Sequence, residues 1–332
     1  MRIKQTLYVL VVCLCGLAAT TAVAENKYSE LVVFGDSLSD PGNVYELTGT
    51  SSKRPFAAGN IPSAPYAIGG HHFSNGKTWS EKLSKSLKSK GGKKPALKSP
   101  KYTNYAFGGS RANPSAGGPF DLSAQLGSYL ANTGGTVDSD ALYAVFFGGN
   151  DIRDALVAFN IAFTQTLSTS GDPAAALAAG QIAAGSILTE AVTAIADNII
   201  ILGSLGVQHL LVPNAPNLGL VPAVTGQGPA VAGLATQLSH GFNQALENAL
   251  AAIEFAIPTV HITRFDTFSF MTARIADPGS SGFKNVVDAC ITPEVKKGAI
   301  CKKPKEYFFW DGIHPTKVVH KLIAEAVLAE LP

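Results

Sequence analysis

Four short polar stretches of this sequence contain residue types that could carry out acyl transfer if the fold brings them together. These residues are Asp36 and Ser37 in "VFGDSLSDPGN", Gly108 and Gly109 in "YAFGGS", Gly149 and Asn150 in "FFGGND", and Asp311 and His314 in "WDGIHPT". Acyl transfer by a serine needs a nucleophile, a base that takes its proton, and a group that orients the base. The four stretches supply all three.

Ser37 is the candidate nucleophile and His314 is the candidate base. Asp311 lies three residues before His314, so one turn of the chain could bring its carboxylate to the imidazole. Pro315 restricts the backbone of His314 to extended conformations and so helps to fix its position. These residues predict a Ser-His-Asp triad.

The reaction also needs hydrogen-bond donors for the oxyanion of the tetrahedral intermediate. The backbone N–H of Ser37 is one candidate. The N–H of Gly109 is another, because a glycine allows close approach of a ligand, and Gly108 is the second choice for this role. The side-chain amide of Asn150 is the third candidate. One such donor contributes roughly 3 to 4 kcal/mol.

Each stretch also has a purely structural interpretation. Acidic and small polar residues are common in turns, and Asn or Asp can cap a helix. We interpret Asp36, Asp40 and Asn43 in this way, as residues that shape the loop around Ser37. The catalytic interpretation of the other residues therefore depends on their meeting at one place.

The surrounding elements are expected to bring them there. The predicted strands cover 30–35, 102–109, 141–151, 207–214 and 259–263, the second and third of which end in a turn. The predicted helices cover 77–87, 173–204, 234–254 and 317–331. This alternation predicts a single three-layer α/β/α domain with a parallel sheet of about five strands. Ligands bind beyond the carboxyl ends of such strands, where three of the four stretches fall.

The first 24 residues have the pattern of a secretory signal peptide. A basic start, "MRIK", precedes an apolar run, and "AVA" before Glu25 is a small-residue cleavage pattern. An uncleaved membrane anchor is the alternative. We therefore expect residues 25–332 to form a single mature domain, secreted or periplasmic, and to act as a monomer.

The charge of the mature chain does not favour nucleic acid as a partner. Cleavage removes two of the 26 basic residues and no acidic one, which leaves 24 basic and 24 acidic residues. The lysine-dense stretch 82–101 is interpreted as a solvated loop. Its alternative role is transient contact with anionic lipid surfaces.

Two of the four cysteines, Cys290 and Cys301, remain after cleavage. In an exported protein two remaining thiols usually pair, and a bridge across so short a loop contributes about 3 kcal/mol in the chain-entropy model. The bridge would pin the segment that delivers Asp311. The alternative is that this loop, with its two adjacent lysines, covers and gates the acyl site.

Six further histidines compete with His314 for the role of base. His71 and His72 lie in a loop that we expect to border the site, and a place in the substrate wall is one alternative for them. The others are interpreted as packing, surface or core residues: His209, His240, His320 and, as a core residue, His261. No group has the spacing of metal ligands on one element, so neither a metal nor a cofactor is expected.

The four stretches resemble the sequence blocks of the GDSL family of esterases and lipases, within the SGNH hydrolases. "FGDSLSDPGN" resembles the first block, whose serine is the nucleophile, here Ser37. "NYAFGG" and "FGGND" resemble the blocks with the oxyanion donors, here Gly109 and Asn150. "DGIHPT" resembles the block with the remaining triad members, Asp311 and His314. The blocks occur in the family's order.

Three further stretches resemble the secreted bacterial phospholipase, lecithinase and haemolysin branch of this family. They are "HHFSNGKTWSEKL", "LLVPNAPNLGLVP" and "GFKNVVDAC". The chain departs from the pattern at Asn217, where relatives often carry Asp, and we expect no effect on the chemistry. The G-x-S-x-G pattern of the α/β-hydrolases does not occur at Ser37.

The resemblance implies a flavodoxin-like fold and ester hydrolysis through an acyl-enzyme, without metal or cofactor. Together with export, it favours acyl esters of lipids as substrates, especially phospholipids and lysophospholipids. Two alternatives use the same chemistry: acyl transfer to a sterol or another alcohol, and hydrolysis of carbohydrate O-acetyl esters. An inactive surface-binding module is the alternative from another class.

Overall fold

A five-stranded parallel sheet forms the middle of the protein. In the computed structural model, which describes residues 27–59 and 61–332, the strand order is β2-β1-β3-β4-β5 and every adjacent pair is parallel. The strands are β1 Glu30–Gly35, β2 Lys90–Gly91, β3 Leu142–Phe146, β4 His209–Pro213 and β5 His261–Phe265. The predicted sheet is therefore confirmed. The predicted signal peptide, 1–24, lies outside the described residues.

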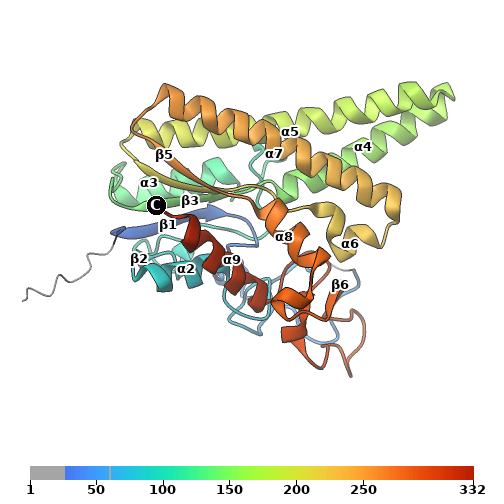
Figure 1. Cartoon of the computed structure of the whole chain (residues 1–332), viewed down its shortest axis with the longest axis horizontal. Coiled ribbons are helices and arrows are strands. Elements are labelled where there is room, and N and C mark those ends of the chain that lie inside the picture. Colours follow the sequence, from blue (N-terminus) through green and yellow to red (C-terminus); the bar gives the residue numbers. More distant parts are fainter. Residues whose placement is uncertain (1–26, 60) are drawn as a thin grey trace, which may run out of the picture.

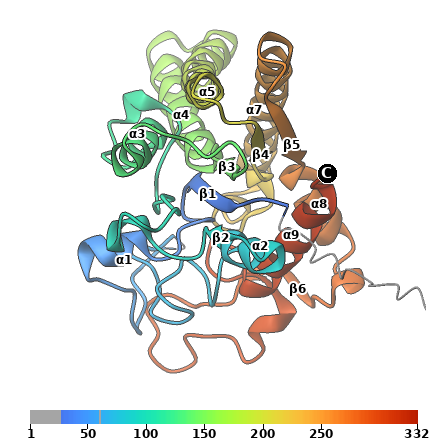
Figure 2. The same ribbon diagram turned by 90° about the vertical axis from the view of Figure 1, so that its left-hand side faces the viewer.

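Helices cover both faces of the sheet (Figure 1). The main covering helices are α2 Trp79–Leu87, α3 Leu122–Thr133, α5 Pro173–Ser204, α7 Pro229–Ala256 and α9 Lys317–Glu330. Helices α5 and α7 lie on one face, and α2 and α9 lie on the other; the view turned by 90° shows the sheet between them (Figure 2). The three-layer α/β/α architecture is confirmed.

The central strands are apolar because helices bury them on both faces. Every residue of β3 is buried, and Leu31 and Phe34 of β1 pair in register with Leu142 and Val145 of β3. One apolar cluster joins the sheet to both helical layers. The carboxyl ends of the strands are thereby held at fixed positions.

The edge of the sheet beside β1 differs from the prediction. The edge strand is β2, inside the lysine-dense stretch for which a solvated loop is expected, and the predicted strand 102–109 forms only isolated bridges at Asn104. Residues 103–107 still run beside β1, since the N–H of Val33 donates to the carbonyl of Thr103 (2.8 Å) and the N–H of Tyr105 donates to the carbonyl of Val33 (2.8 Å). On the outer side, the amide of Asn43 donates to the carbonyls of Asn104 (2.9 Å) and Ala106 (2.8 Å). A side chain thus occupies the acceptors that a further strand would need.

Helix α4 (Gly149–Ser170), which the sequence pattern does not predict, forms a hairpin with α5 that projects beyond the sheet (Figure 1). The two helices approach closely at Gly180, where an added Cβ would lie 2.9 Å from the ring of Phe159. Residues 155–189 contain a single charged residue, Asp172. By its length and composition alone, helix α5 could cross a membrane. Part of it is nevertheless buried within this fold, against α4 and α7.

The remaining elements of the described chain are short. The helices are α1 Asn43–Thr48, α6 Pro222–Thr225 and α8 Thr267–Ala276, and a second parallel sheet contains β6 Asn285–Ala289 and β7 Tyr307–Phe309. Single 3₁₀ turns cover Ala96–Lys98, Pro114–Ala116, Leu218–Leu220, Gly279–Ser281 and Pro304–Glu306. The sequence pattern does not predict the second sheet.

Candidate active site

Ser37 lies two residues after the end of the inner strand β1. Gly35 ends this strand at a crowded position, where a Cβ would lie 3.1 Å from the carbonyl oxygen of Phe146 in β3. The side chain of Gln125, from α3, donates to the Gly35 carbonyl (2.8 Å) and accepts a hydrogen bond from its N–H (2.9 Å). The turn that carries Ser37 is thus fixed from two sides at the carboxyl edge of the sheet.

The structure brings Ser37, His314 and Asp311 into one hydrogen-bonded chain. Nε2 of His314 lies 2.7 Å from Oγ of Ser37, and Nδ1 lies 2.8 Å from Oδ2 of Asp311. With the Nδ1 proton donated to the carboxylate, the lone pair of Nε2 faces the serine hydroxyl, as proton removal from Ser37 requires. All three side chains are buried.

The Asp311 side chain folds back on its own loop. Its Oδ1 accepts hydrogen bonds from the N–H groups of Ile313 (2.9 Å) and His314 (2.8 Å), while the N–H of Trp310 donates to the carbonyl of His314 (2.7 Å). This turn is the reason that a separation of three residues lets carboxylate and imidazole meet. The position of the histidine is therefore set locally.

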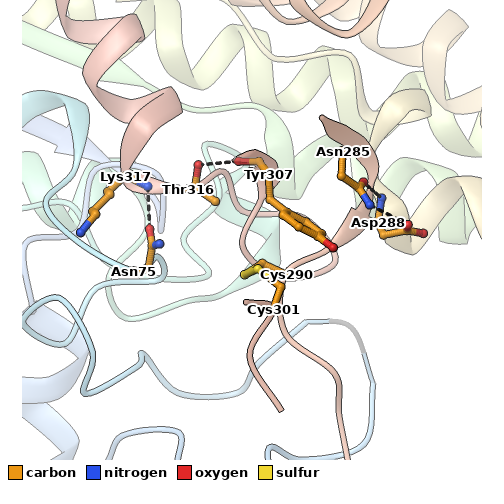
Figure 3. Close-up of a disulfide and its surroundings, with 8 residues drawn as sticks. All are labelled: Asn75, Asn285, Asp288, Cys290, Cys301, Tyr307, Thr316 and Lys317. Atoms are coloured by element: carbon orange, nitrogen blue, oxygen red, sulfur yellow. Dashed lines mark hydrogen bonds between the residues drawn. A yellow bond between two sulfur atoms is a disulfide. The ribbon is translucent and has the colours of Figure 1, made fainter. Parts of the chain in front are cut away.

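A second segment, which the sequence interpretation missed, holds the histidine loop from outside. Ser74 donates to the carbonyl of Pro315 (2.8 Å), and the Asn75 side chain accepts a hydrogen bond from the N–H of Lys317 at the start of α9 (2.7 Å). Figure 3 shows the Asn75 contact beside the bond from the Thr316 hydroxyl to the carbonyl of Tyr307 (2.9 Å). The only signal in the sequence is that both residues lie within "HHFSNGKTWSEKL".

The predicted Cys290–Cys301 disulfide is present (Figure 3). It belongs to a small apolar cluster with Tyr66 and Trp310, directly before Asp311. Burial, and then the neighbouring Asp311 carboxylate, raise the pKa of the Tyr66 phenol. No residue of the loop between the cysteines lines the cavity in front of Ser37, so the contacts of the described chain fit the pinning role rather than the gate.

The three candidate oxyanion donors lie at this edge of the sheet. Within the described residues, the backbone N–H groups of Ser37 and Gly109 have no acceptor, whereas the N–H of Gly108 donates to Asp40 (3.0 Å). Gly109 has φ +87°, and no atom lies within 4 Å of the position of an added Cβ. The Asn150 amide donates one hydrogen bond to the carbonyl of Ser110 (2.8 Å), which leaves its second proton free.

The loop that contains Gly109 is fastened to the first turns of α4. Arg111 donates to the Gly109 carbonyl (2.5 Å) and forms a two-point ion pair with Asp154 (2.7 and 3.0 Å). Asp151 accepts hydrogen bonds from the N–H groups of Ala112 (3.1 Å) and Asn113 (2.9 Å). Helix α4 thus positions Asn150 and Gly109 together, through supports that the sequence interpretation missed.

Two buried acids shape the Ser37 loop, as their interpretation as turn residues predicts. Asp36 accepts a hydrogen bond from the N–H of Leu38 (2.9 Å), and Asp40 accepts from the N–H groups of Gly42 (2.7 Å) and Asn43 (2.5 Å). Burial raises the pKa of each carboxyl to about 6. The loop therefore contains two carboxyl groups whose ionisation is costly.

The other histidines do not approach Ser37 as candidate bases. The substrate-wall alternative is wrong for His71 and His72: His71 stacks on Tyr45, and Nε2 of His72 lies 2.6 Å from Glu81. His320 does line the cavity, where burial lowers its pKa to about 3. The prediction of a core position is wrong for His261, which is exposed because it begins the edge strand β5.

A cavity of ≈ 270 Å³ lies in front of Ser37, lined also by Asn150 and His314. Most of its wall is apolar and includes Leu38, Phe73, Phe146, Leu218, Phe270 and Ile323. Residues of the sheet, α8 and α9 thus contribute to one wall. Such a cavity suits a hydrocarbon group next to a polar reacting centre.

Comparison with known proteins assigns the family. The family model described as GDSL-like Lipase/Acylhydrolase matches residues 31–327. The chain therefore belongs to the GDSL-like lipase/acylhydrolase family and is a hydrolase that acts on esters.

The similar proteins are distant in sequence. A GDSL esterase/lipase of Arabidopsis thaliana is 26% identical over 94% of this chain and 92% of its own length. The phosphatidylcholine-sterol acyltransferase of Aeromonas hydrophila is 24% identical over 95% of this chain and 94% of its own length. Two other curated relatives are matched over only 38% and 50% of their own length. The extracellular lipase of Streptomyces rimosus aligns with 92% of this chain at 15% identity and a TM-score of 0.44.

Proposed function

We propose that the protein is a secreted or periplasmic serine hydrolase that cleaves acyl esters of lipids, with phospholipids or lysophospholipids as substrates. The hydrogen-bonded chain from Ser37 through His314 to Asp311 carries this proposal. Residues 25–332 would form a single domain that acts as a monomer, since one chain supplies the triad and the cavity wall. The disulfide is consistent with an extracellular protein.

In the proposed mechanism, His314 removes the proton of Ser37 as Oγ attacks the ester carbonyl carbon. Asp311 keeps the imidazole in the tautomer that can accept this proton and stabilises the imidazolium. The N–H groups of Ser37 and Gly109 and the amide of Asn150 would donate to the oxyanion. His314 then protonates the leaving alcohol, and water resolves the acyl-enzyme by the same steps in reverse.

The lipid part of the proposal has weaker but independent support. The apolar cavity wall next to Ser37 suits an acyl chain. Most lysines of the stretch 82–101 are exposed, which suits transient contact with an anionic lipid surface. One of the similar proteins acts on phosphatidylcholine, as its name states.

Acyl transfer to a sterol is the second candidate function, favoured by similarity to that acyltransferase along nearly the whole of both chains. In this reaction an alcohol replaces water in the resolution of the acyl-enzyme. Adding a sterol to the lipid assay and measuring steryl ester separates the two functions.

The proposal is tested with a lysophospholipid, a short p-nitrophenyl ester and an acetylated sugar, comparing the wild-type mature protein with Ser37→Ala. We expect fatty acid release from the lysophospholipid by the wild type and none by the variant. Turnover of the short ester or the acetylated sugar alone would contradict the lipid assignment. Failure of Ser37 to react with an alkyl phosphonate, without turnover of any substrate, would favour the inactive binding module.

A further inference from the structure

Arg153 brings to the cavity a charge that the proposed mechanism does not use. It lies on α4 one helical turn after Asn150, so the two side chains share a face of the helix. Both residues line the cavity in front of Ser37. A guanidinium is therefore placed beside the reacting centre, in a wall that is otherwise mostly apolar.

The acidic side chains near Arg153 make their hydrogen bonds to other groups, although the charges of Asp154 and Asp36 still attract the guanidinium. Both carboxylate oxygens of Asp154 accept hydrogen bonds from Arg111. Asp151 accepts from two backbone N–H groups of the adjacent loop, and Asp36 accepts from one backbone N–H group. Across residues 27–59 and 61–332, the Arg153 guanidinium has neither a hydrogen bond nor an ion pair within 4 Å.

This arrangement is costly without a ligand. Burial, and then the charge of Arg111, lower the pKa of the Arg153 guanidinium, yet arginine remains protonated in proteins. The charges of Asp154 and Asp36 offset this loss of hydration only in part, since the net effect on the pKa is a lowering. The nearby N-terminus of α4 adds positive potential, which also favours an anion.

A second polar group on the cavity wall also has no partner. The Thr267 hydroxyl, at the start of α8, is buried and has no hydrogen-bond partner in the part of the chain that the structure describes. A pure hydrocarbon ligand would leave both Thr267 and Arg153 unsatisfied. A ligand with a negatively charged group next to its acyl chain would give Arg153 a partner.

We propose that Arg153 binds the phosphodiester group of a glycerophospholipid while an acyl ester of the same molecule lies at Ser37. This inference rests on the proposed function and names the substrate class within it. The three residues from Asn150 to Arg153 rise about 4.5 Å along the helix, which is comparable to the separation of the acyl ester and the phosphate along a glycerol backbone. Arginine suits this task because its planar fork can donate two parallel hydrogen bonds to phosphate oxygens.

The test compares two soluble substrates with identical acyl chains, dibutyroyl glycerophosphocholine and dibutyrylglycerol. The measured quantity is the ratio of kcat/KM for the phosphate-bearing ester to that for the neutral ester. Arg153→Gln should lower this ratio about ten- to a hundredfold, the range expected from losing hydrogen bonds to a charged group. Arg153→Lys, which keeps the charge but loses the fork, should give an intermediate ratio.

Arg264→Gln is the matched control, because it removes the same charge from β5 at an ion pair with Glu247 and Glu254 outside this cavity. It should keep the wild-type ratio. A wild-type ratio in Arg153→Gln overturns the inference. Inorganic phosphate is tested as an inhibitor of the wild type and of Arg153→Gln. If it inhibits only the wild type while the ratio of kcat/KM values is the same in both proteins, the inference is also overturned, because the site then binds free phosphate and not a lipid headgroup. Absence of turnover of both esters by the wild type, or equal turnover by Ser37→Ala, overturns the proposed function instead.

Discussion

Replacing Asp36 by asparagine should stabilise the protein at neutral pH. The Asp36 carboxyl is 3% exposed, and burial raises its pKa from 3.8 to about 6. Asparagine has nearly the same shape and keeps an oxygen that can accept the hydrogen bond from the N–H of Leu38. It has no charge to bury, so the cost of ionising this site disappears.

The sign and size of the effect follow from the two pKa values. The folded protein holds the Asp36 proton more tightly than the unfolded chain does, so the free energy of unfolding falls as the pH rises from about 4 to about 6. A difference of about two in pKa corresponds to about 3 kcal/mol. The stabilisation by Asp36→Asn should therefore be about 3 kcal/mol above pH 6 and close to zero near pH 4.

Urea unfolding of both proteins at pH values from about 4 to about 8 measures this difference. Asp172→Asn is the matched control, since this exposed residue caps α5 through a hydrogen bond from the N–H of Ala174 that asparagine can also accept. The control should show no rise of the difference between pH 4 and 6. A gain that does not depend on pH, or a loss at neutral pH, would refute the assignment of Asp36 as a costly buried anion.

Three further predictions concern the supports of the site. Arg111→Met should lower kcat for a short ester about tenfold, because it releases the loop that contains Gly109. Adding Asp154→Asn to this variant should cause little further loss, because the two residues act as one pair. Additive losses in steady-state kinetics would contradict this. Asn75→Ala should lower the free energy of unfolding by about 1 kcal/mol, measured by urea titration, because α9 loses its capping acceptor; an unchanged midpoint would contradict it. Replacing Cys290 and Cys301 by serine should lower the free energy of unfolding by about 3 kcal/mol and leave kcat/KM of the folded enzyme near the wild-type value. A large loss of activity without unfolding would instead support the alternative that the loop between the cysteines gates the site.

The sequence pattern predicts well the residues that meet at the edge of the sheet. Ser37 and Asn150 each follow a short continuous apolar run that is typical of a buried parallel strand, so their common edge follows from the fold class. His314 and Asp311 meet through a turn that the two residues form themselves. The local signals therefore suffice for these positions.

The supports of the site depend on partners that are distant in the sequence, and no periodicity reveals them. Gln125 reaches Gly35 across 90 residues, and Arg111 reaches Asp154 across 43. The segment predicted as a strand at 102–109 pairs with β1 through single backbone hydrogen bonds, but on its outer side two of its carbonyls accept from the side chain of a distant asparagine and not from another strand. No periodicity predicts α4, because its residues 155–170 carry no charge that would mark a solvent-exposed face, and the helix is stabilised by its contact with α5.

Asp40 has a consequence for how the site opens. Its carboxylate accepts hydrogen bonds from the N–H groups of Gly42, Asn43 and Val44, where the loop after Ser37 enters α1, and from Gly108 in the neighbouring loop. Neither loop can leave its place without stranding a buried carboxylate. We therefore expect the two loops to open as one cooperative unit, whose backbone amide protons exchange with solvent together, so that Ser37 and Gly109 leave their positions together.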